Sequence, residues 1–219
     1  MDIILIGAPG AGKGTQAEKL AQRFGIRHIS SGDLFHKAFE EQTELGLKAR
    51  MYVDLGELVP DEMTIPLALQ HIEEPESLHG VVLDGFPRTL AQALALDEEL
   101  RQLNREIDLV ISLKVSHGEL LKRLTGRVFC QANAHIYNTE LHPPKVSGIC
   151  DLDGSRLYQR SDDTGEAMRK RLVNFSYEAG HILDHYEKQH KLREIDGEQS
   201  IDQVYEAILS EINNHAASK

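Results

Sequence analysis

The chain has 219 residues, of which 41% are hydrophobic and 27% are charged, and its formal net charge at pH 7 is −11. This length and composition suit one globular α/β domain with small insertions, and they exclude a disordered or fibrous chain. The excess negative charge argues against general nucleic-acid binding, which requires a basic surface.

Short apolar runs alternate with amphipathic stretches along most of the chain. The runs that we interpret as buried strands are 2–7, 80–85, 108–115 and 191–196. The stretches predicted as helices are 13–24, 89–103, 116–125, 163–189 and 200–214. Continuous apolar strands that alternate with helices predict a parallel sheet covered on both faces. In such a sheet the ligand crevice lies at the carboxyl ends of the strands.

Two segments interrupt this alternation. Residues 30–60 show helical patterns with no strand between them, and residues 127–160 lose helical periodicity and carry Gly, Pro and β-forming residues. We interpret the first as a small helical insertion and the second as a β-rich flap. The predicted domains are a core, a helical insertion and a lid. The core comprises 1–29, 60–126 and 164–219, the helical insertion 30–59 and the lid 127–163.

The first predicted strand is followed by a glycine-rich turn, GAPGAGKGT (7–15), which nearly matches the phosphate-binding pattern G-x-x-x-x-G-K-[ST]. Its glycines let the backbone wrap closely around phosphate oxygens, and the following helix adds its positive end. Lys13 is expected to reach the outer phosphates. The pattern requires a hydroxyl directly after Lys13, where Gly14 stands, so we assign the metal-side hydroxyl to Thr15.

A second anion site is predicted in VVLDGFPRTLAQ (81–92). Asp84 ends a strand, where an acidic residue can organise magnesium through water. The following turn projects Arg88, whose planar guanidinium suits bidentate contact with a second phosphate. Two phosphate sites at one crevice predict a kinase.

Several sequence blocks together resemble adenylate kinases of the bacterial long form, which carry a lid. The blocks are GAPGAGKGTQ, SSGDLF, LDGFPRTLAQ, GR at 126–127, HPPK at 142–145, and QRSDD with the later RKRL. They follow in order over almost the whole chain. The phosphate loop occurs in many families, whereas the LDGFPRT block and the lid arginines are specific to this one. The resemblance implies a P-loop NTPase-like parallel sheet flanked by helices, with a helical acceptor-binding insertion and a β-rich lid. In this family GKGT is the usual form of the loop, so Gly14 is expected.

The resemblance implies reversible phosphoryl transfer from ATP to AMP, giving two ADP, with Mg²⁺ bound to ATP. No nucleophilic side chain is needed, because a phosphate oxygen of the acceptor attacks, and catalysis consists of positioning and charge neutralisation. A closing lid is expected to exclude water, which would otherwise hydrolyse ATP.

The resemblance also implies the residues of each site. The ATP site would comprise Gly10, Ala11, Gly12, Lys13, Gly14, Thr15, Arg127, Ile136, Tyr137 and Gln199. The AMP site would comprise Ser31, His36, Glu57, Leu58, Val59, Gly85, Phe86, Pro87, Arg88, Gln92, Arg160 and Arg171. The catalytic groups would be Lys13, Asp84, Arg88, Arg123, Arg160 and Arg171. Gln92 carries both a donor and an acceptor with which to read a purine edge.

Position 36 departs from the family, which usually has an arginine there that binds the acceptor phosphate, whereas this chain has His36. A histidine is mostly neutral near pH 7 and lacks the guanidinium fork. We expect weaker acceptor binding without loss of activity, since Arg88 remains. If His36 contacts the acceptor phosphate, the KM for AMP is expected to rise between about pH 6 and 8.

The lid departs from the family as well. Some lids hold zinc through C-x2-C…C-x2-[CD], and the corresponding residues here are Cys130, Asn133, Cys150 and Asp153. Asn133 is a poor zinc ligand, but His135 follows two residues later. Two interpretations stay open: one structural Zn²⁺ held by Cys130, His135, Cys150 and Asp153, or a metal-free lid held by packing and hydrogen bonds. A Cys130–Cys150 disulfide is less favoured in a reducing compartment.

Two other functions stay open: a kinase for UMP or CMP with the same fold, and an ATP-binding switch or ATPase without an acceptor. Gln92 and the long lid favour AMP. The apolar runs are far shorter than the roughly 20 residues of a membrane span, and the first residues lack the features of a signal peptide. We therefore expect a cytoplasmic monomer whose partners are ATP, AMP and ADP, and which binds neither nucleic acid nor membrane.

Overall fold

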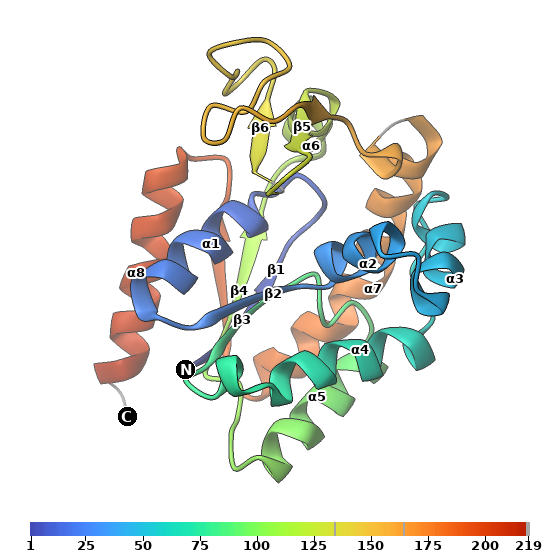
Figure 1. Ribbon diagram of the computed structural model, residues 1–219. Coiled ribbons are helices and arrows are strands. Elements are labelled where there is room, and N and C mark those ends of the chain that lie inside the picture. Colours follow the sequence, from blue (N-terminus) through green and yellow to red (C-terminus); the bar gives the residue numbers. More distant parts are fainter. Residues whose placement is uncertain (134, 164, 218–219) are drawn as a thin grey trace.

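The computed structural model describes residues 1–133, 135–163 and 165–217. A parallel sheet with the strand order β2-β3-β1-β4-β8 forms its centre (Figure 1). The strands are β1 (Asp2–Ile6), β2 (Arg27–Ser30), β3 (Val81–Asp84), β4 (Leu109–Lys114) and β8 (Leu192–Asp196). Four of them coincide with the predicted strands, and the predicted fold class is confirmed.

The helices are α1 (Lys13–Phe24), α2 (Ser31–Glu40), α3 (Glu44–Val53), α4 (Asp61–Glu73), α5 (Leu90–Gln102), α6 (His117–Thr125), α7 (Gly165–Lys188) and α8 (Ile201–Ala217). Short 3₁₀ turns occur at Pro75–Ser77 and Ser161–Asp163. The five predicted helices are present as α1, α5, α6, α7 and α8. None of the described helices is long and apolar enough to cross a membrane.

The core lies on both faces of the sheet, because successive strand residues point to opposite sides. Ile3 and Leu5 of β1 pack among apolar residues of α1, α6 and α8, whereas Ile4 and Ile6 pack among those of α4, α5 and α7. Figure 1 shows α1 and α8 on one side of the sheet and α4 and α5 on the other. Burial on both faces accounts for the continuous apolar runs.

Helices α2 and α3 form a small unit beside this core with its own buried cluster of Phe35, Ala49 and Val59. The two helices approach very closely at Gly46, where an added Cβ would lie 2.1 Å from the carbonyl oxygen of Ala38. Only glycine permits that approach.

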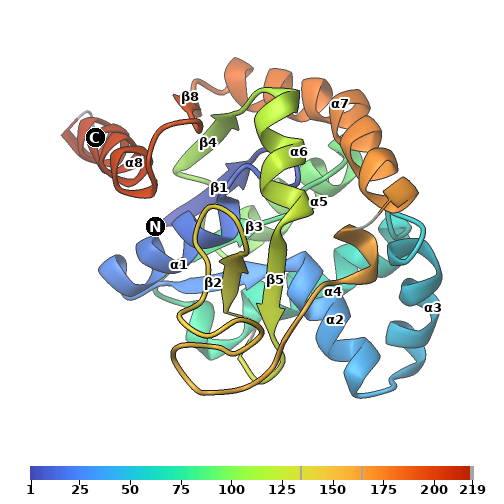
Figure 2. The ribbon, with the colours of Figure 1, turned by 90° about the horizontal axis from the view of Figure 1, so that it is seen from above.

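The lid segment contains an antiparallel sheet with the order β6-β5-β7. Its strands are β5 (Arg127–Cys130), β6 (Ile136–Asn138) and β7 (Leu157–Tyr158). Figure 2, which views the molecule from above, shows β5 and β6 over the region where α1 and β1 meet. The β-rich flap therefore lies over the carboxyl ends of the central strands.

Candidate functional site

A cleft of about 920 Å³ lies between the carboxyl ends of the central strands, the lid and the α2–α3 unit. The glycine-rich turn, the end of β3, α2, the lid and the start of α7 all contribute to its lining. This volume is in the range of nucleotide-sized ligand sites.

The glycine-rich turn forms one wall of the cleft. Gly10 and Gly12 have φ values of 85° and 94°, in the left-handed region that favours glycine. Helix α1 begins at Lys13 with no side-chain cap and no acidic residue in its first turn, so its positive end is available to an anion. Lys13 Nζ donates to the carbonyl oxygens of Gly7 (2.8 Å) and Ala8 (3.2 Å). Burial lowers the pKa of Lys13 to about 8, although Asp84 opposes this shift.

Asp84 lies opposite this lysine at the end of β3, with its Oδ1 3.9 Å from Lys13 Nζ. Burial would raise the pKa of Asp84, but His28 and Lys13 outweigh that effect and hold it below its ordinary value. A Cβ on residue 14 would lie 3.3 Å from Asp84 Oδ2. Gly14 therefore keeps the space beside this carboxylate clear, and a carboxylate next to open space fits the magnesium of a nucleotide.

Arg88 lies in the turn after β3. Its Nε donates to the carbonyl oxygen of Gly85 (2.8 Å), which also accepts from Ser31 Oγ (2.6 Å). Gly85 has a φ of 73°, and an added Cβ would lie 2.8 Å from Arg88 Nη2. Burial, followed by the nearby charge of Arg171, lowers the pKa of Arg88. Two partly buried guanidinium groups of like charge that influence each other in this way suit a multivalent anion.

Gln92 lies in the first turn of α5, lines the cleft and is only 1% exposed. Its Nε2 donates to Asp61 Oδ1 (2.7 Å), and its Oε1 accepts from the backbone N–H of Arg88 (2.7 Å). Thr89 Oγ1 donates to the second oxygen of Asp61 (2.9 Å). Both ends of the Gln92 amide are therefore held within the protein.

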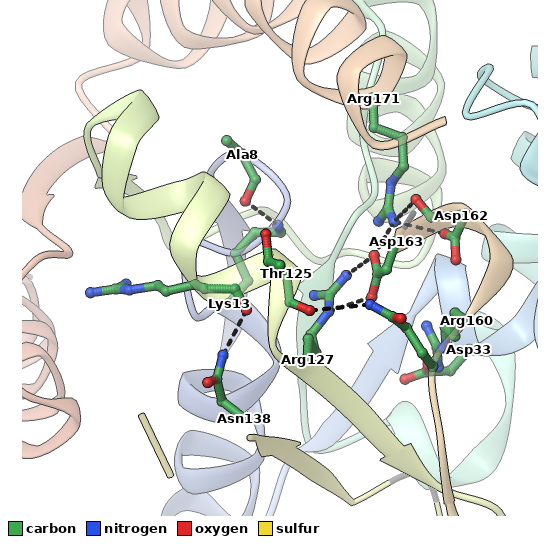
Figure 3. Close-up of polar contacts among 12 residues, drawn as sticks. Ala8, Lys13, Asp33, Thr125, Arg127, Asn138, Arg160, Asp162, Asp163 and Arg171 are labelled. Atoms are coloured by element: carbon green, nitrogen blue, oxygen red, sulfur yellow. Dashed lines mark hydrogen bonds and ion pairs between the residues drawn. The ribbon is translucent and has the colours of Figure 1, made fainter. Parts of the chain in front are cut away.

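Two of the predicted arginines, Arg127 and Arg171, pair with the neighbouring aspartates Asp162 and Asp163 (Figure 3). Arg127 Nε donates to Asp163 Oδ2 (2.6 Å), and Arg171 Nη1 pairs with Asp163 Oδ1 (2.7 Å) and Asp162 Oδ2 (2.8 Å). Arginines on both sides keep the pKa of Asp163 low against the opposing effect of burial. The aspartates position the two guanidinium groups at the edge of the cleft.

Arg160 and Arg123 have other partners. Arg160 pairs with Asp33 on α2 (2.7 Å) and lies 3.8 Å above the ring of Phe129. Arg123 contacts Glu119 and the carbonyl oxygen of Gly197, both at 2.9 Å. Both arginines line the cleft, but their guanidinium groups do not share the carboxylates that hold Arg127 and Arg171.

His36 also lines the cleft, with its ring edge-on to Phe39. Burial, followed by the nearby charge of Arg160, lowers the pKa of His36 to about 4, although Asp162 and Asp33 act in the opposite direction. The hypothesis that this histidine titrates between pH 6 and 8 is therefore corrected, because it is neutral throughout that range.

The remaining predicted residues fall into two groups. Most line the cleft: Ala11, Thr15, Glu57, Leu58, Val59, Pro87, Ile136, Tyr137 and Gln199. Phe86 is instead fully buried in the core between the sheet and α4–α5. The hydroxyl of Tyr137 lies 3.4 Å from Cys150 Sγ and accepts from the backbone N–H of Asp151, so it belongs to the lid contacts.

The lid brings Cys130, His135, Cys150 and Asp153 together, with one ligand atom of each within 4.8 Å of the others. Cys130 Sγ lies 3.1 Å from Asp153 Oδ2, and His135 Nδ1 lies 3.4 Å from Cys150 Sγ. A tetrahedral zinc site with usual bond lengths has ligand–ligand distances of about 3.3–3.8 Å. Asn133 donates to Asp153 Oδ2 (2.7 Å), and so contacts one of these four candidate ligands. The donor set fits zinc.

Sequence reasoning missed Asp61, Asp162 and Asp163 as parts of the site. Asp61 lies 31 residues from Gln92, and no local pattern connects the two. Asp162 and Asp163 directly follow the QRS of the lid block, and two acidic residues between predicted phosphate-binding arginines are a signal that could have identified them.

Comparisons with known proteins agree on one family. The family model described as adenylate kinase matches residues 5–191. An adenylate kinase of Staphylococcus aureus is 47% identical over 209 residues, which cover 95% of this chain and 97% of the relative. One of Carboxydothermus hydrogenoformans is 47% identical over 208 residues, and one of Staphylococcus epidermidis is 46% identical over 209, with the same coverage.

Proposed function

This chain belongs to the adenylate kinase family, and we infer that it transfers a phosphoryl group reversibly from ATP to AMP, giving two ADP. The arrangement that supports this best is a pair of cationic phosphate sites on opposite sides of one cleft. The glycine-rich turn with Lys13 forms one site, Arg88 with Arg171 forms the other, and Asp84 lies beside the first.

In this reaction the phosphates of ATP bind the backbone N–H groups of the turn and the ammonium group of Lys13. The phosphate of AMP binds Arg88, whose guanidinium is already oriented by the carbonyl of Gly85. Arg127 and Arg171, positioned by Asp162 and Asp163, supply positive charge to the transferring group. Catalysis then consists of alignment and charge neutralisation, with no covalent intermediate on the protein.

Magnesium would be held near Asp84 and Thr15, where Gly14 leaves room. When bound, it neutralises phosphate charge. In the lid, Cys130, His135, Cys150 and Asp153 would hold one structural zinc ion. We also expect the protein to act as a cytoplasmic monomer that binds neither nucleic acid nor membrane.

The test is an assay of ADP formation from ATP and AMP, and of ATP formation from ADP alone. Parallel reactions with CMP, UMP and GMP separate this function from that of another monophosphate kinase. A reaction without acceptor detects an ATPase. Activity that is greatest with CMP or UMP, or hydrolysis that is independent of acceptor, would contradict the proposal.

Arg88→Ala provides a test of the acceptor site. Loss of a preorganised group that neutralises charge in the transition state typically costs about 10²–10³ in rate. We expect a loss of that order in kcat/KM for AMP. Arg101→Ala is the matched control, because Arg101 pairs with Glu98 on the exposed face of the same helix that Arg88 precedes. Near-wild-type kcat/KM in Arg88→Ala would remove Arg88 from the acceptor site.

A further inference from the structure

The side-chain amide of Gln92 is held in one of its two possible orientations. An amide presents an oxygen that only accepts and a nitrogen that only donates. Asp61 Oδ1 accepts from Nε2, and the backbone N–H of Arg88 donates to Oε1. Rotating the amide by 180° would place its oxygen against a carboxylate and its nitrogen against an N–H group. Both contacts would then be repulsive, so the surroundings prevent the flip.

The arrangement leaves one N–H of Nε2 and one lone pair of Oε1 for a ligand. Gln92 is buried, lies in the wall of the cleft, and is adjacent to the phosphate site at Arg88. Both α4 and α5 hold the side chain of Gln92 in position (Figure 1). Asp61 is the first residue of α4, and it also accepts a hydrogen bond from Thr89, the N-cap residue of α5.

The two families of purine require opposite orientations of such an amide. A 6-amino purine offers a donor at position 6 and an acceptor at N1, which pair with Oε1 and Nε2 respectively. A 6-oxo purine offers an acceptor at position 6 and a donor at N1, so it can pair only with the flipped amide. An amide that rotates freely accepts both purines, whereas an amide that is fixed accepts one.

We propose that Asp61 is a specificity-determining residue, which selects 6-amino over 6-oxo purine monophosphates by fixing the orientation of the Gln92 amide. The proposal rests on the proposed function, because it concerns the acceptor of the same reaction. Asp61 acts through Gln92 and is therefore a positioning residue.

The wild-type protein allows a first test with three acceptors: AMP, IMP, and purine ribonucleoside monophosphate, which keeps the N1 acceptor and has hydrogen at position 6. A fixed amide makes two hydrogen bonds to AMP, one to the unsubstituted purine and none to IMP. We expect kcat/KM to fall in that order. A freely flipping amide would make two bonds to IMP, and IMP reacting as well as the unsubstituted purine would overturn the proposal.

Variants provide the second test. Asp61→Asn keeps the shape of the side chain but can donate as well as accept, and Asp61→Ala removes the contact. In both we expect the ratio of kcat/KM for AMP to that for IMP to fall about tenfold or more, as for loss of a charged hydrogen-bond partner. The KM for AMP should rise, and the KM for ATP should stay unchanged. Glu62→Gln, which alters the neighbouring exposed carboxylate in the same helical turn, is the control.

The outcomes separate this proposal from the underlying function. If the wild-type protein does not convert ATP and AMP to ADP, the proposed function fails. If that reaction proceeds, and both Asp61 variants fold with a wild-type KM for ATP yet keep the wild-type AMP to IMP ratio, only the role of Asp61 is overturned.

Discussion

The charge of Lys13 depends on pH near the physiological range, because burial lowers its pKa to about 8. Only the ammonium form pairs with phosphate, so the fraction competent to bind ATP falls above pH 8. We expect the KM for ATP to rise between pH 8 and 9.5, approaching tenfold per pH unit at the upper end. Steady-state kinetics over pH 7–9.5 measures this.

Lys13→Arg is the control, because a guanidinium keeps its charge throughout this range. Its KM for ATP should be independent of pH, whatever its absolute value. The lowered pKa of Lys13 in the wild-type protein also affects the stability of the folded chain. The unfolded chain binds more protons than the folded chain between pH 8 and the ordinary lysine pKa, so the contribution of Lys13 to stability improves as pH rises through that window. A wild-type KM for ATP that is constant up to pH 9.5 would contradict the assignment of Lys13.

His36 has its pKa lowered to about 4 because it is buried beside Arg160. It is therefore neutral at pH 7 and adds no charge to the acceptor site. His36→Arg should place a third guanidinium near the acceptor phosphate and lower the KM for AMP several-fold at pH 7, as expected of a charge-assisted hydrogen bond. The KM for ATP should not change, and an unchanged KM for AMP would show that residue 36 does not reach the phosphate.

Acid should destabilise the protein through the same residue. The pKa of His36 in the folded chain lies below its unfolded value of about 6.5, so the stability present above pH 6.5 is lost as pH falls toward 4. Burial of the ring contributes most to this loss, the charges of Arg160 and Arg171 add to it, and those of Asp33 and Asp162 oppose it.

At the scale of elements, the lid should depend on a metal for its stability. The lid sheet is small, and its four candidate ligands lie within 4.8 Å of one another. We expect one zinc per chain in protein purified without a His-tag or chelator, measured by elemental analysis. Because none of the four candidate ligands belongs to the two proposed phosphate sites, zinc removal should lower the unfolding temperature while leaving the turnover of folded enzyme largely intact. A loss of about 2 kcal/mol corresponds to about 4–8 °C.

Two variants sharpen this test. Cys150→Ser should lose the metal and reproduce the lower unfolding temperature. Asn133→Ala should keep one zinc per chain, because Asn133 contacts the candidate ligand Asp153 and is not itself one of the four candidate ligands. A metal content near zero in the wild type, with no stabilisation by added Zn²⁺, would leave Cys130 and Cys150 as packed thiols.

The elements that the sequence predicts well are those whose burial is continuous. β1, β3 and β4 are apolar along nearly their whole length, and α1 matches its predicted bounds. In contrast, β2 buries only Ile29 among its four residues, and α4 contains Pro66 and few charged residues that would mark a polar face. These two elements are held by contacts with distant segments, which no local pattern reveals.

The same distinction applies to the site. Lys13, Asp84 and Arg88 stand in short motifs whose chemistry is local, so their common cleft follows from the parallel sheet. The contacts that orient them are not local, since Asp61 reaches Gln92 and Asp163 reaches Arg127 across 31 and 36 residues. The sequence also could not reveal the low pKa of His36, which arises from burial and from the charge of Arg160, both of which only folding produces.

At the scale of the whole molecule, the lid end and the α2–α3 unit are joined across the mouth of the cleft. Arg160 pairs with Asp33, and Ser161 Oγ donates to Asp54 Oδ1, both at 2.7 Å. Asp33 and Asp54 are 49% and 42% exposed in their side chains. Contacts made by side chains as exposed as these stabilise the closed cleft by at most about 1 kcal/mol. That free energy is enough to shift the equilibrium between open and closed clefts about fivefold.

Asp33→Asn should therefore favour the open cleft in protein without nucleotide. Small-angle X-ray scattering should give a larger radius of gyration than in the wild type, and saturating ADP should restore the wild-type value, because nucleotide phosphates then hold the arginines. Glu44→Ala is the control, since Glu44 pairs with Lys48 within α3 and not across the cleft. If the radius of gyration of Asp33→Asn equals that of the control, the Arg160–Asp33 pair does not hold the cleft closed, and closure depends on the nucleotides alone.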